Sequence, residues 1–149
     1  MLRAWVVLAF TLLLPATATA QEVFFDRIDG TWTCLWVDPS RGYIYECSMI
    51  LVQSKSNALE GNITWTLVRS PRPEDAERLG TGAIEYVRGA IDPKTGRVNF
   101  KGHDKDDPVG VIGLDDYKLE LSESGTWMFG PTATNGAGTG RFTAFRRYW

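Results

Sequence analysis

Apolar and polar residues alternate along most of this chain with a period of two, which is typical of β-strands that bury one face. The segment 59–68 shows this most clearly: Leu59, Gly61, Ile63, Trp65 and Leu67 share one face, and Glu60, Asn62, Thr64 and Thr66 share the other. Seven other segments are typical of strands: 32–36, 43–53, 83–92, 97–101, 117–122, 127–130 and 140–147. Eight short strands separated by turn residues predict an all-β fold. We expect an eight-stranded antiparallel barrel in up-and-down (meander) order, with a β-sandwich as the alternative.

Helical periodicity is weak throughout the chain. The best helix candidate is Glu74–Leu79, which follows the loop Pro71-Arg72-Pro73. The segment has room for one or two turns at most, so it does not change the all-β prediction.

Two turns share the form D-P-x-x-G, at 38–42 and 92–96. Proline presets the first residue of such a turn, aspartate accepts hydrogen bonds from the turn amides, and glycine supplies the left-handed residue that closes the loop. A four-residue loop at 39–42 sets the register of the first hairpin. Counting back along both strands then places Trp36 opposite Tyr45 and Cys34 opposite Cys47.

The opposed cysteines predict a structural disulfide between Cys34 and Cys47. Directly opposed Cβ atoms of an antiparallel pair lie about 4.5–5.5 Å apart, which a disulfide bridges with modest adjustment. Closing a loop of this size stabilises the fold by about 3 kcal/mol. The chain has no C-x-x-C sequence and a single histidine, His103, so the spacing favours a disulfide over a redox or zinc site.

The second D-P-x-x-G turn predicts the inward face of another hairpin. It places Ile91 opposite Val98 and Gly89 opposite Phe100, and it brings Glu85 near Asp104 at the far end. Because Glu85 shares the apolar face, its carboxyl group points inward. An inward carboxylate requires water, a hydrogen-bonding partner or a bound ligand.

The N-terminal residues have the form of a signal peptide. Arg3 precedes an apolar run at 6–14, and Ala18-Thr19-Ala20 has the A-x-A form of a cleavage site. The run is too short to serve as a lasting membrane anchor. We therefore expect a signal peptide at 1–20, a single barrel domain at 21–149, and a periplasmic or secreted mature protein.

Composition and charge argue against some classes of binding partner. The chain has a formal net charge of −2, so it lacks the basic surface that nucleic acids and anionic membranes require. A membrane barrel is disfavoured because Arg141 and Arg147 share the face of the last strand that alternates back from Trp149, and arginines facing lipid are costly. The six tryptophans, five tyrosines and seven phenylalanines of the chain indicate a well-packed fold.

The segment Gly30-Thr31-Trp32 at the start of the first strand, with Arg141 or Arg146 in the last, resembles the structural signature of the calycins, which include lipocalins and avidins. In that family the first-strand tryptophan plugs one barrel end and a last-strand basic residue packs across it. The helix-poor, hairpin-rich layout is most similar to avidin. The resemblance implies an avidin-like barrel but no biotin site, because the biotin-binding residues have no counterparts here.

Aromatic side chains and one carboxyl group are the candidate ligand contacts. Small-ligand pockets are mostly apolar, with a few placed polar groups. The candidates are Trp36, Tyr45, Trp65, Glu85, Tyr117 and Trp127. The alternative is that these rings simply fill a narrow barrel.

Reactive chemistry has little support in the sequence. The acidic group of Asp104, Asp106, Asp107, Asp115 and Asp116 lacks the spacing of a calcium loop. His103 has no nucleophile elbow to serve, and a Glu85–Asp104 pair for glycoside hydrolysis is weakly supported. We expect no metal ion and no cofactor.

The sequence therefore predicts an exported, non-enzymatic β-barrel that binds a small apolar or aromatic ligand. One alternative is a filled barrel that acts through its 70–82 and 132–140 loops as an inhibitor or protein-interaction module. A hydrolase is the weaker alternative.

Overall fold

The computed structural model describes residues 25, 27–134 and 138–148. The expected signal peptide at 1–20, its cleavage site, Trp149 and the centre of the 132–140 loop lie outside the described residues.

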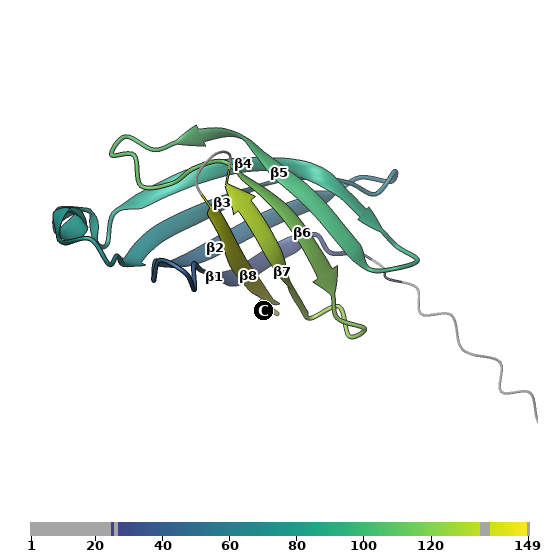
Figure 1. Ribbon diagram of the computed structural model, residues 1–149. Helices are drawn as coiled ribbons and strands as arrows, with labels where there is room; N and C mark the ends of the chain where they lie inside the picture. Colours follow the sequence, from purple (N-terminus) through teal and green to yellow (C-terminus); the bar gives the residue numbers. More distant parts are fainter. Residues whose placement is uncertain (1–24, 26, 135–137, 149) are drawn as a thin grey trace, which may run out of the picture.

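Eight antiparallel strands close into one barrel in sequence order, with β8 pairing back onto β1 (Figure 1). The strands are β1 Gly30–Val37, β2 Ile44–Gln53, β3 Ala58–Arg69, β4 Gly82–Asp92, β5 Arg97–Asp106, β6 Asp115–Leu121, β7 Trp127–Thr134 and β8 Gly138–Arg146. A short 3-10 helix, η1 (Pro73–Arg78), lies between β3 and β4 at one end of the barrel. The up-and-down barrel is confirmed, and the sandwich alternative is not what the chain adopts.

Buried and exposed residues alternate along much of the barrel, as expected for strands with one face toward the core. In β6, for example, every second residue is buried and the residues between are exposed. Most inward side chains are large and apolar, so closing the barrel removes them from water and offsets the cost of ordering the chain. The packed centre contains Trp32, Met49, Ile63, Val87, Phe100, Leu119 and Met128, all at most 4% exposed.

The first hairpin has the register that the sequence predicts. Cys34 pairs with Cys47 and Trp36 pairs with Tyr45. The two cysteines form a disulfide with their Cα atoms 4.8 Å apart. The bridge ties β1 to β2 from the inner face of the barrel, directly beneath the Trp36–Tyr45 pair.

The second hairpin follows its predicted register only as far as Val87. A bulge between Tyr86 and Val87 shifts the pairing, so Glu85 lies opposite Lys105 and not beside Asp104. The extra residue that a bulge introduces cannot be read from the turn, because it depends on how the strand bends around the barrel. Glu85 still points inward and is 1% exposed.

Both D-P-x-x-G turns use their aspartates as expected. Asp38 accepts hydrogen bonds from the Ser40 and Arg41 amides at 2.9 Å, and Asp92 accepts one from the Lys94 amide at 2.9 Å. Gly42 has a φ of 83°, in the left-handed region that favours glycine.

One end of the barrel is closed by Trp32, which is completely buried. Its indole nitrogen donates a hydrogen bond to the carbonyl of Ile28 at 3.1 Å. The Arg146 guanidinium lies 5.8 Å from the Trp32 ring centre and donates to the carbonyl of Asp29 at 2.6 Å. Arg141, in contrast, is exposed on β8. The last-strand arginine beside the first-strand tryptophan is therefore Arg146.

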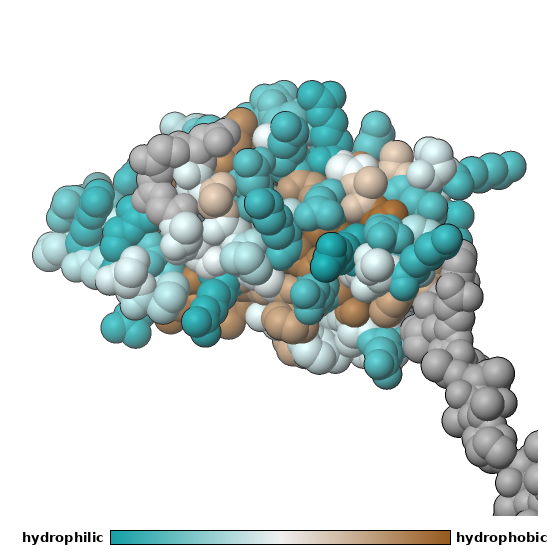
Figure 2. Space-filling view, turned by 45° about the vertical axis from the view of Figure 1, so that its right-hand side comes forward, coloured by the Kyte–Doolittle hydropathy of each residue, from teal (hydrophilic) through white to brown (hydrophobic). Residues whose placement is uncertain are grey.

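On the face shown in Figure 2, many surface residues are charged or polar, with apolar side chains showing between them. The larger exposed apolar residues include Ile50, Val52, Phe129 and Phe145. Among the described residues, no helix has the length and apolar character needed to cross a membrane.

Candidate functional site: a cavity at the open end of the barrel

A cavity of about 320 Å³ occupies the end of the barrel opposite Trp32. Its walls come from inward residues of β1 to β4, β6 and β7, and its rim comes from the 38–43 loop, η1 and the 107–114 loop. The lining side chains that matter below are Trp36, Tyr45, Trp65, Leu67, Glu85 and Asp115. The barrel is thus packed along one half and hollow along the other.

Three aromatic rings on neighbouring strands form one wall of the cavity. Trp36 and Tyr45 meet edge to face with their centres 5.5 Å apart, and Tyr45 meets Trp65 in the same way at 6.1 Å. These contacts follow from the register, because Trp36 and Tyr45 are direct cross-strand partners. Edge-to-face pairs are a favoured aromatic geometry, so each ring helps to fix the next.

Hydrogen bonds within the protein occupy the polar edges of these rings. Trp36 donates its indole N–H to the Thr132 hydroxyl at 2.6 Å, and Tyr45 donates its hydroxyl to the Val111 carbonyl at 2.7 Å. Trp65 donates its indole N–H to Glu85 at 3.1 Å. The wall therefore offers carbon atoms and π surfaces to a ligand, without free donors on these three rings.

Glu85 is the buried carboxyl group of the cavity. Its Oε2 accepts hydrogen bonds from Trp65 Nε1 and from the Tyr117 hydroxyl, the latter at 2.6 Å, and its Oε1 accepts one from the Asp115 amide at 2.9 Å. Burial raises its pKa to about 7, because desolvation of the charged form outweighs these hydrogen bonds. In the part of the chain that the structure describes, it forms no salt bridge with a basic residue.

A second buried carboxyl group, Asp115, lies on β6 beside Glu85. Its pKa is also raised by burial, against the hydrogen bonds from Thr134 and Thr132. Both acidic groups and the buried Tyr117 hydroxyl sit on the inner side of the cavity. Burial likewise raises the pKa of Tyr117 well above its usual range. This inner side is therefore rich in hydrogen-bond acceptors, and no basic residue among those that the structure describes forms a salt bridge with its carboxylates.

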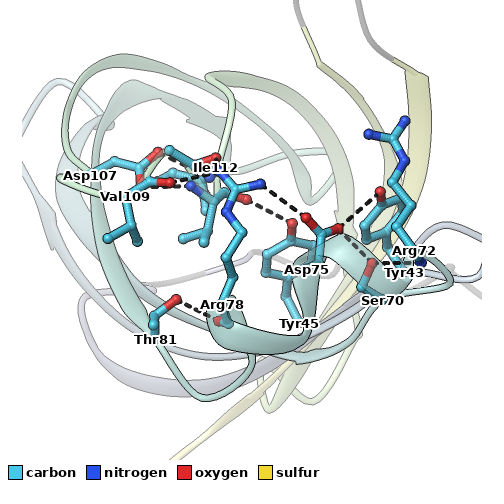
Figure 3. A network of polar contacts seen from close by, with 12 residues as sticks. Tyr43, Tyr45, Ser70, Arg72, Asp75, Arg78, Thr81, Asp107, Val109 and Ile112 are labelled. Atoms are coloured by element: carbon cyan, nitrogen blue, oxygen red, sulfur yellow. Dashed lines mark hydrogen bonds and ion pairs between the residues drawn. The ribbon is translucent and has the colours of Figure 1, made fainter.

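The rim is held by a network around η1 (Figure 3). Asp75 accepts hydrogen bonds from Ser70 at 2.6 Å, from Arg78 at 3.0 Å and from Tyr43 at 3.4 Å. Arg78 also donates to the carbonyls of Val109 and Gly110 in the 107–114 loop. Arg78 thus links the helix to the loop on the opposite side of the opening.

The 107–114 loop is shaped by its own aspartate. Asp107 accepts from the amides of Val111 and Ile112, at 2.8 and 3.0 Å, and forms a salt bridge with Lys105 at 2.9 Å. Hydrogen bonds from the Ile112 and Val111 amides hold the Asp107 pKa below its usual value, although burial acts to raise it. The loop presents the Val111 carbonyl to Tyr45 and so contributes to the cavity wall.

Three arginines reach the opening, and two of them are neutralised within the protein. Arg41 pairs with Asp38 at 2.7 Å, and Arg78 pairs with Asp75 at 3.0 Å. The third, Arg72, lies over the ring of Tyr43 at 5.9 Å. Positive charge is thus found at the solvent-facing rim, whereas the buried carboxyl groups lie deeper.

The structure brings most of the candidate contacts together. Trp36, Tyr45, Trp65 and Glu85 line the cavity. Tyr117 lies beneath it, where its hydroxyl bonds to Glu85. Trp127 is on the outside of β7, 38% exposed and stacked on Phe129, because the inward position is taken by Met128. The sequence predicts that Trp127 contributes to the interior, whereas the alternation along β7 places its neighbour Met128 there.

Two kinds of cavity residue are not among the ligand contacts that the sequence predicts. The sequence predicts Asp115 as one of a group of acidic loop residues, but the alternation Asp115, Tyr117, Leu119 places it on the inner face. The rim residues Asp75 and Arg78 pair with each other, and Arg78 contacts the 107–114 loop, which is distant from it in sequence. The alternation of buried and exposed residues along β6 is enough to identify Asp115 as an inward residue. The rim contacts, in contrast, depend on the closed barrel, which brings distant segments together.

The residues considered for catalysis and metal binding do not lie together in the structure. Asp104 is exposed and pairs with Tyr86, so it is separate from buried Glu85. His103 is exposed on β5. Within residues 25, 27–134 and 138–148, no three His, Cys, Asp or Glu side chains are grouped so that they can hold a metal ion.

Comparison with known proteins supports the fold. No protein-family profile and no curated protein matches this sequence. Among solved structures, the chain is similar to a redesigned β-barrel, mFAP0, bound to DFHBI. The two are 15% identical with a TM-score of 0.56, and the match covers 80% of this chain and 98% of that one.

Proposed function

We propose that this chain is an exported barrel protein that binds a small, largely aromatic or apolar molecule in its end cavity. The observation that carries the proposal is the unequal filling of the barrel. The half that contains Trp32 is packed with large side chains, whereas the half that contains Trp36 and Trp65 encloses about 320 Å³. That volume lies at the lower end of the range of small-ligand pockets.

The cavity has the composition of a ligand site. Its wall is aromatic and aliphatic, and its few polar groups are fixed by internal hydrogen bonds. Ligand pockets typically combine such an apolar wall with a small number of placed polar groups, because the wall supplies affinity and the polar groups supply orientation. A barrel with a similar backbone, mFAP0, has been captured with DFHBI, so this architecture is compatible with holding a small molecule.

Export is supported by two observations. The disulfide between Cys34 and Cys47 suits an oxidising compartment, and residues 1–20 have the form of a signal peptide. We therefore place the mature protein, residues 21–149, in the periplasm or outside the cell. Mass determination of protein from the native host tests this, since an intact Met1–Ala20 segment would contradict it.

A distant relation to the calycins is part of the same proposal. It is supported by the contact between Trp32 and Arg146 at the closed end, and by Gly30, whose φ of 127° lies in the region that favours glycine. It implies a binding barrel and no particular ligand.

The other two functions gain less from the structure. A filled barrel acting through its loops requires a packed interior, and the cavity does not fit that description. A hydrolase using Glu85 with Asp104 requires two facing carboxyl groups, and Asp104 is on the outside.

Native mass spectrometry of protein purified from its own host tests the binding function directly. We expect a bound molecule of a few hundred daltons, lost on mild denaturation. The matched control is the Trp36→Ala, Trp65→Ala double variant, which removes two of the three rings of the aromatic wall and should purify without the molecule. A host-derived protein that carries no small molecule, and gains none from a host extract, would contradict the proposal.

A further inference from the structure

Acidic and basic side chains lie at different depths in the cavity. Glu85 and Asp115 lie at its inner side, buried and without a bonded basic residue among the described ones, whereas Arg41, Arg72 and Arg78 lie at the rim. Arg41 and Arg78 are already neutralised by Asp38 and Asp75. The depth of the cavity is therefore a site of negative potential enclosed by aromatic rings.

Glu85 still has capacity to accept a hydrogen bond or a charge contact. A carboxylate accepts about four hydrogen bonds, and Glu85 receives three from the described part of the chain. Only one of these three reaches Oε1, from the Asp115 amide. A buried carboxylate is costly without a countercharge, and its raised pKa reflects the same deficit. A positive group in the cavity would supply that charge.

The aromatic wall suits the same kind of group. Trp36, Tyr45 and Trp65 have their polar edges bonded within the protein, so their remaining surfaces are π faces and ring edges. Cations are attracted to the faces of Trp and Tyr rings, most strongly where both are desolvated. An anion would meet these faces and two carboxyl groups, and it would be repelled by both.

We propose that the cavity selects an organic ammonium ion with an aromatic or alkyl body, its positive group lying against Glu85 and the rings of Trp36, Tyr45 and Trp65. This inference rests on the proposed function, because it names the ligand class of the same cavity. A primary or secondary ammonium group donates a hydrogen bond to Glu85 Oε1. The apolar body extends toward Leu67 and the opening.

Three probes of matched shape test the inference: 2-phenylethylammonium, 2-phenylethanol and 3-phenylpropionate. Binding is measured by isothermal titration calorimetry with the full mature protein at pH 8, where Glu85 is mostly ionised because its pKa is about 7. We expect the ammonium probe to bind at least about tenfold more tightly than the alcohol. The carboxylate should bind most weakly.

Two variants locate the effect. Glu85→Gln removes the charge at nearly constant volume and should reduce the preference for ammonium over alcohol to about threefold or less. Asp115→Asn should lower it by a smaller factor, and it serves if Glu85→Gln does not fold. Glu60→Gln, which removes an exposed carboxylate on β3, is the matched control and should keep the full preference.

The outcomes separate this inference from the proposed function. If the alcohol or the carboxylate binds the wild-type protein as tightly as the ammonium probe, the inference is wrong and the binding function stands. A preference that survives both Glu85→Gln and Asp115→Asn also overturns it. If no probe binds, the inference fails, while the binding function is judged separately by whether the host-derived protein carries a small molecule.

Discussion

At the scale of single residues, Glu85 shows how one inward polar side chain can shape a cavity. A Cβ added to Gly102 would come within 2.1 Å of its Oε1, so the carboxyl group needs a glycine on the neighbouring strand. It also bonds to β3 and β6 through Trp65, Tyr117 and the Asp115 amide. One carboxyl group therefore joins three strands at the floor of the cavity.

The raised pKa of Glu85 predicts a pH-dependent stability. The unfolded chain releases this proton near pH 4.5 and the folded protein near pH 7. Between these values the folded state binds more protons, so the free energy of unfolding falls as pH rises, by about 3 kcal/mol in all. Urea denaturation at pH 5, 6, 7 and 8 measures the fall.

Glu85→Gln supplies the comparison for this prediction. The variant should lose most of the fall between pH 5 and 7, because it has no carboxyl group to titrate there. Glu60→Gln should keep the fall. An equal slope in the wild type and Glu85→Gln would show that another group is responsible. Aspartates with lowered pKa values, such as Asp38, titrate at lower pH and do not confuse the result.

Gly140 is a second residue on which the cavity depends. A Cβ there would come within 2.1 Å of the Trp36 ring, so Gly140→Ala must displace the ring. We expect a loss of about 1–3 kcal/mol of stability and weaker ligand binding. Gly82→Ala is the control, because its Cβ would meet only the Trp65 carbonyl at an ordinary 3.5 Å. Thermal unfolding of both variants distinguishes them, and equal losses would argue against the packing explanation.

At the scale of elements, the first hairpin is defined by its turn and its disulfide. The D-P-x-x-G turn fixes the register, and that register places Cys34 and Cys47 face to face. The bridge in turn holds the Trp36–Tyr45 pair, which lies between it and the cavity rim. Local turn chemistry thus positions part of the cavity wall.

Removing the disulfide should weaken the barrel without changing its topology. For the Cys34→Ala, Cys47→Ala variant we expect a free energy of unfolding lower by about 3 kcal/mol. Denaturant titration measures it, and a reducing agent should lower the stability of the wild type but not of the variant. Unchanged stability would mean that hairpin pairing alone fixes the register.

The two D-P-x-x-G turns form a natural pair for testing burial. Asp38 is completely buried and accepts from Ser40 and Arg41, whereas Asp92 is exposed. Although burial opposes it, hydrogen bonds from Ser40 and Arg41 lower the Asp38 pKa to about 2. Asp38→Ala should cost about 1–3 kcal/mol, because it leaves buried donors unpaired.

Asp92→Ala is the matched control and should cost less, because water replaces the lost carboxylate. The stabilisation from Asp38 is present above pH 4 and is lost as pH falls through 2, since its folded-state pKa lies below the unfolded value. Comparing the two alanine variants by urea denaturation at pH 7 checks the ranking. A larger loss for Asp92→Ala would contradict it.

At the scale of the whole molecule, the barrel has one closed end and one open end. Trp32 and Arg146 close the first, and Arg78 links η1 to the 107–114 loop across the second (Figure 3). This asymmetry places the cavity at the open end, away from Trp32. The rim contacts of η1 and the 107–114 loop border the opening of the cavity.

Arg78→Ala should therefore loosen the rim and leave the barrel intact. We expect amide hydrogen exchange at 109–112 to increase about tenfold, because hydrogen bonds from a charged group are lost. Exchange in β1 and β2 should not change. Arg88→Ala, on the exposed face of β4, is the control. Unchanged exchange at 109–112 in Arg78→Ala would show that Asp107 holds the loop by itself.

The sequence by itself determined the strands, the first register, the disulfide and the inward face that carries Trp65 and Glu85. These follow from period-two alternation and from turn residues, both of which act over a few positions. Only the tertiary structure decided the bulge at Tyr86–Val87, the choice of Arg146 over Arg141, the outward position of Trp127 and the rim contacts of Arg78. The hollow half of the barrel is also tertiary, because an unfilled volume depends on how all eight strands close, and no short segment encodes it.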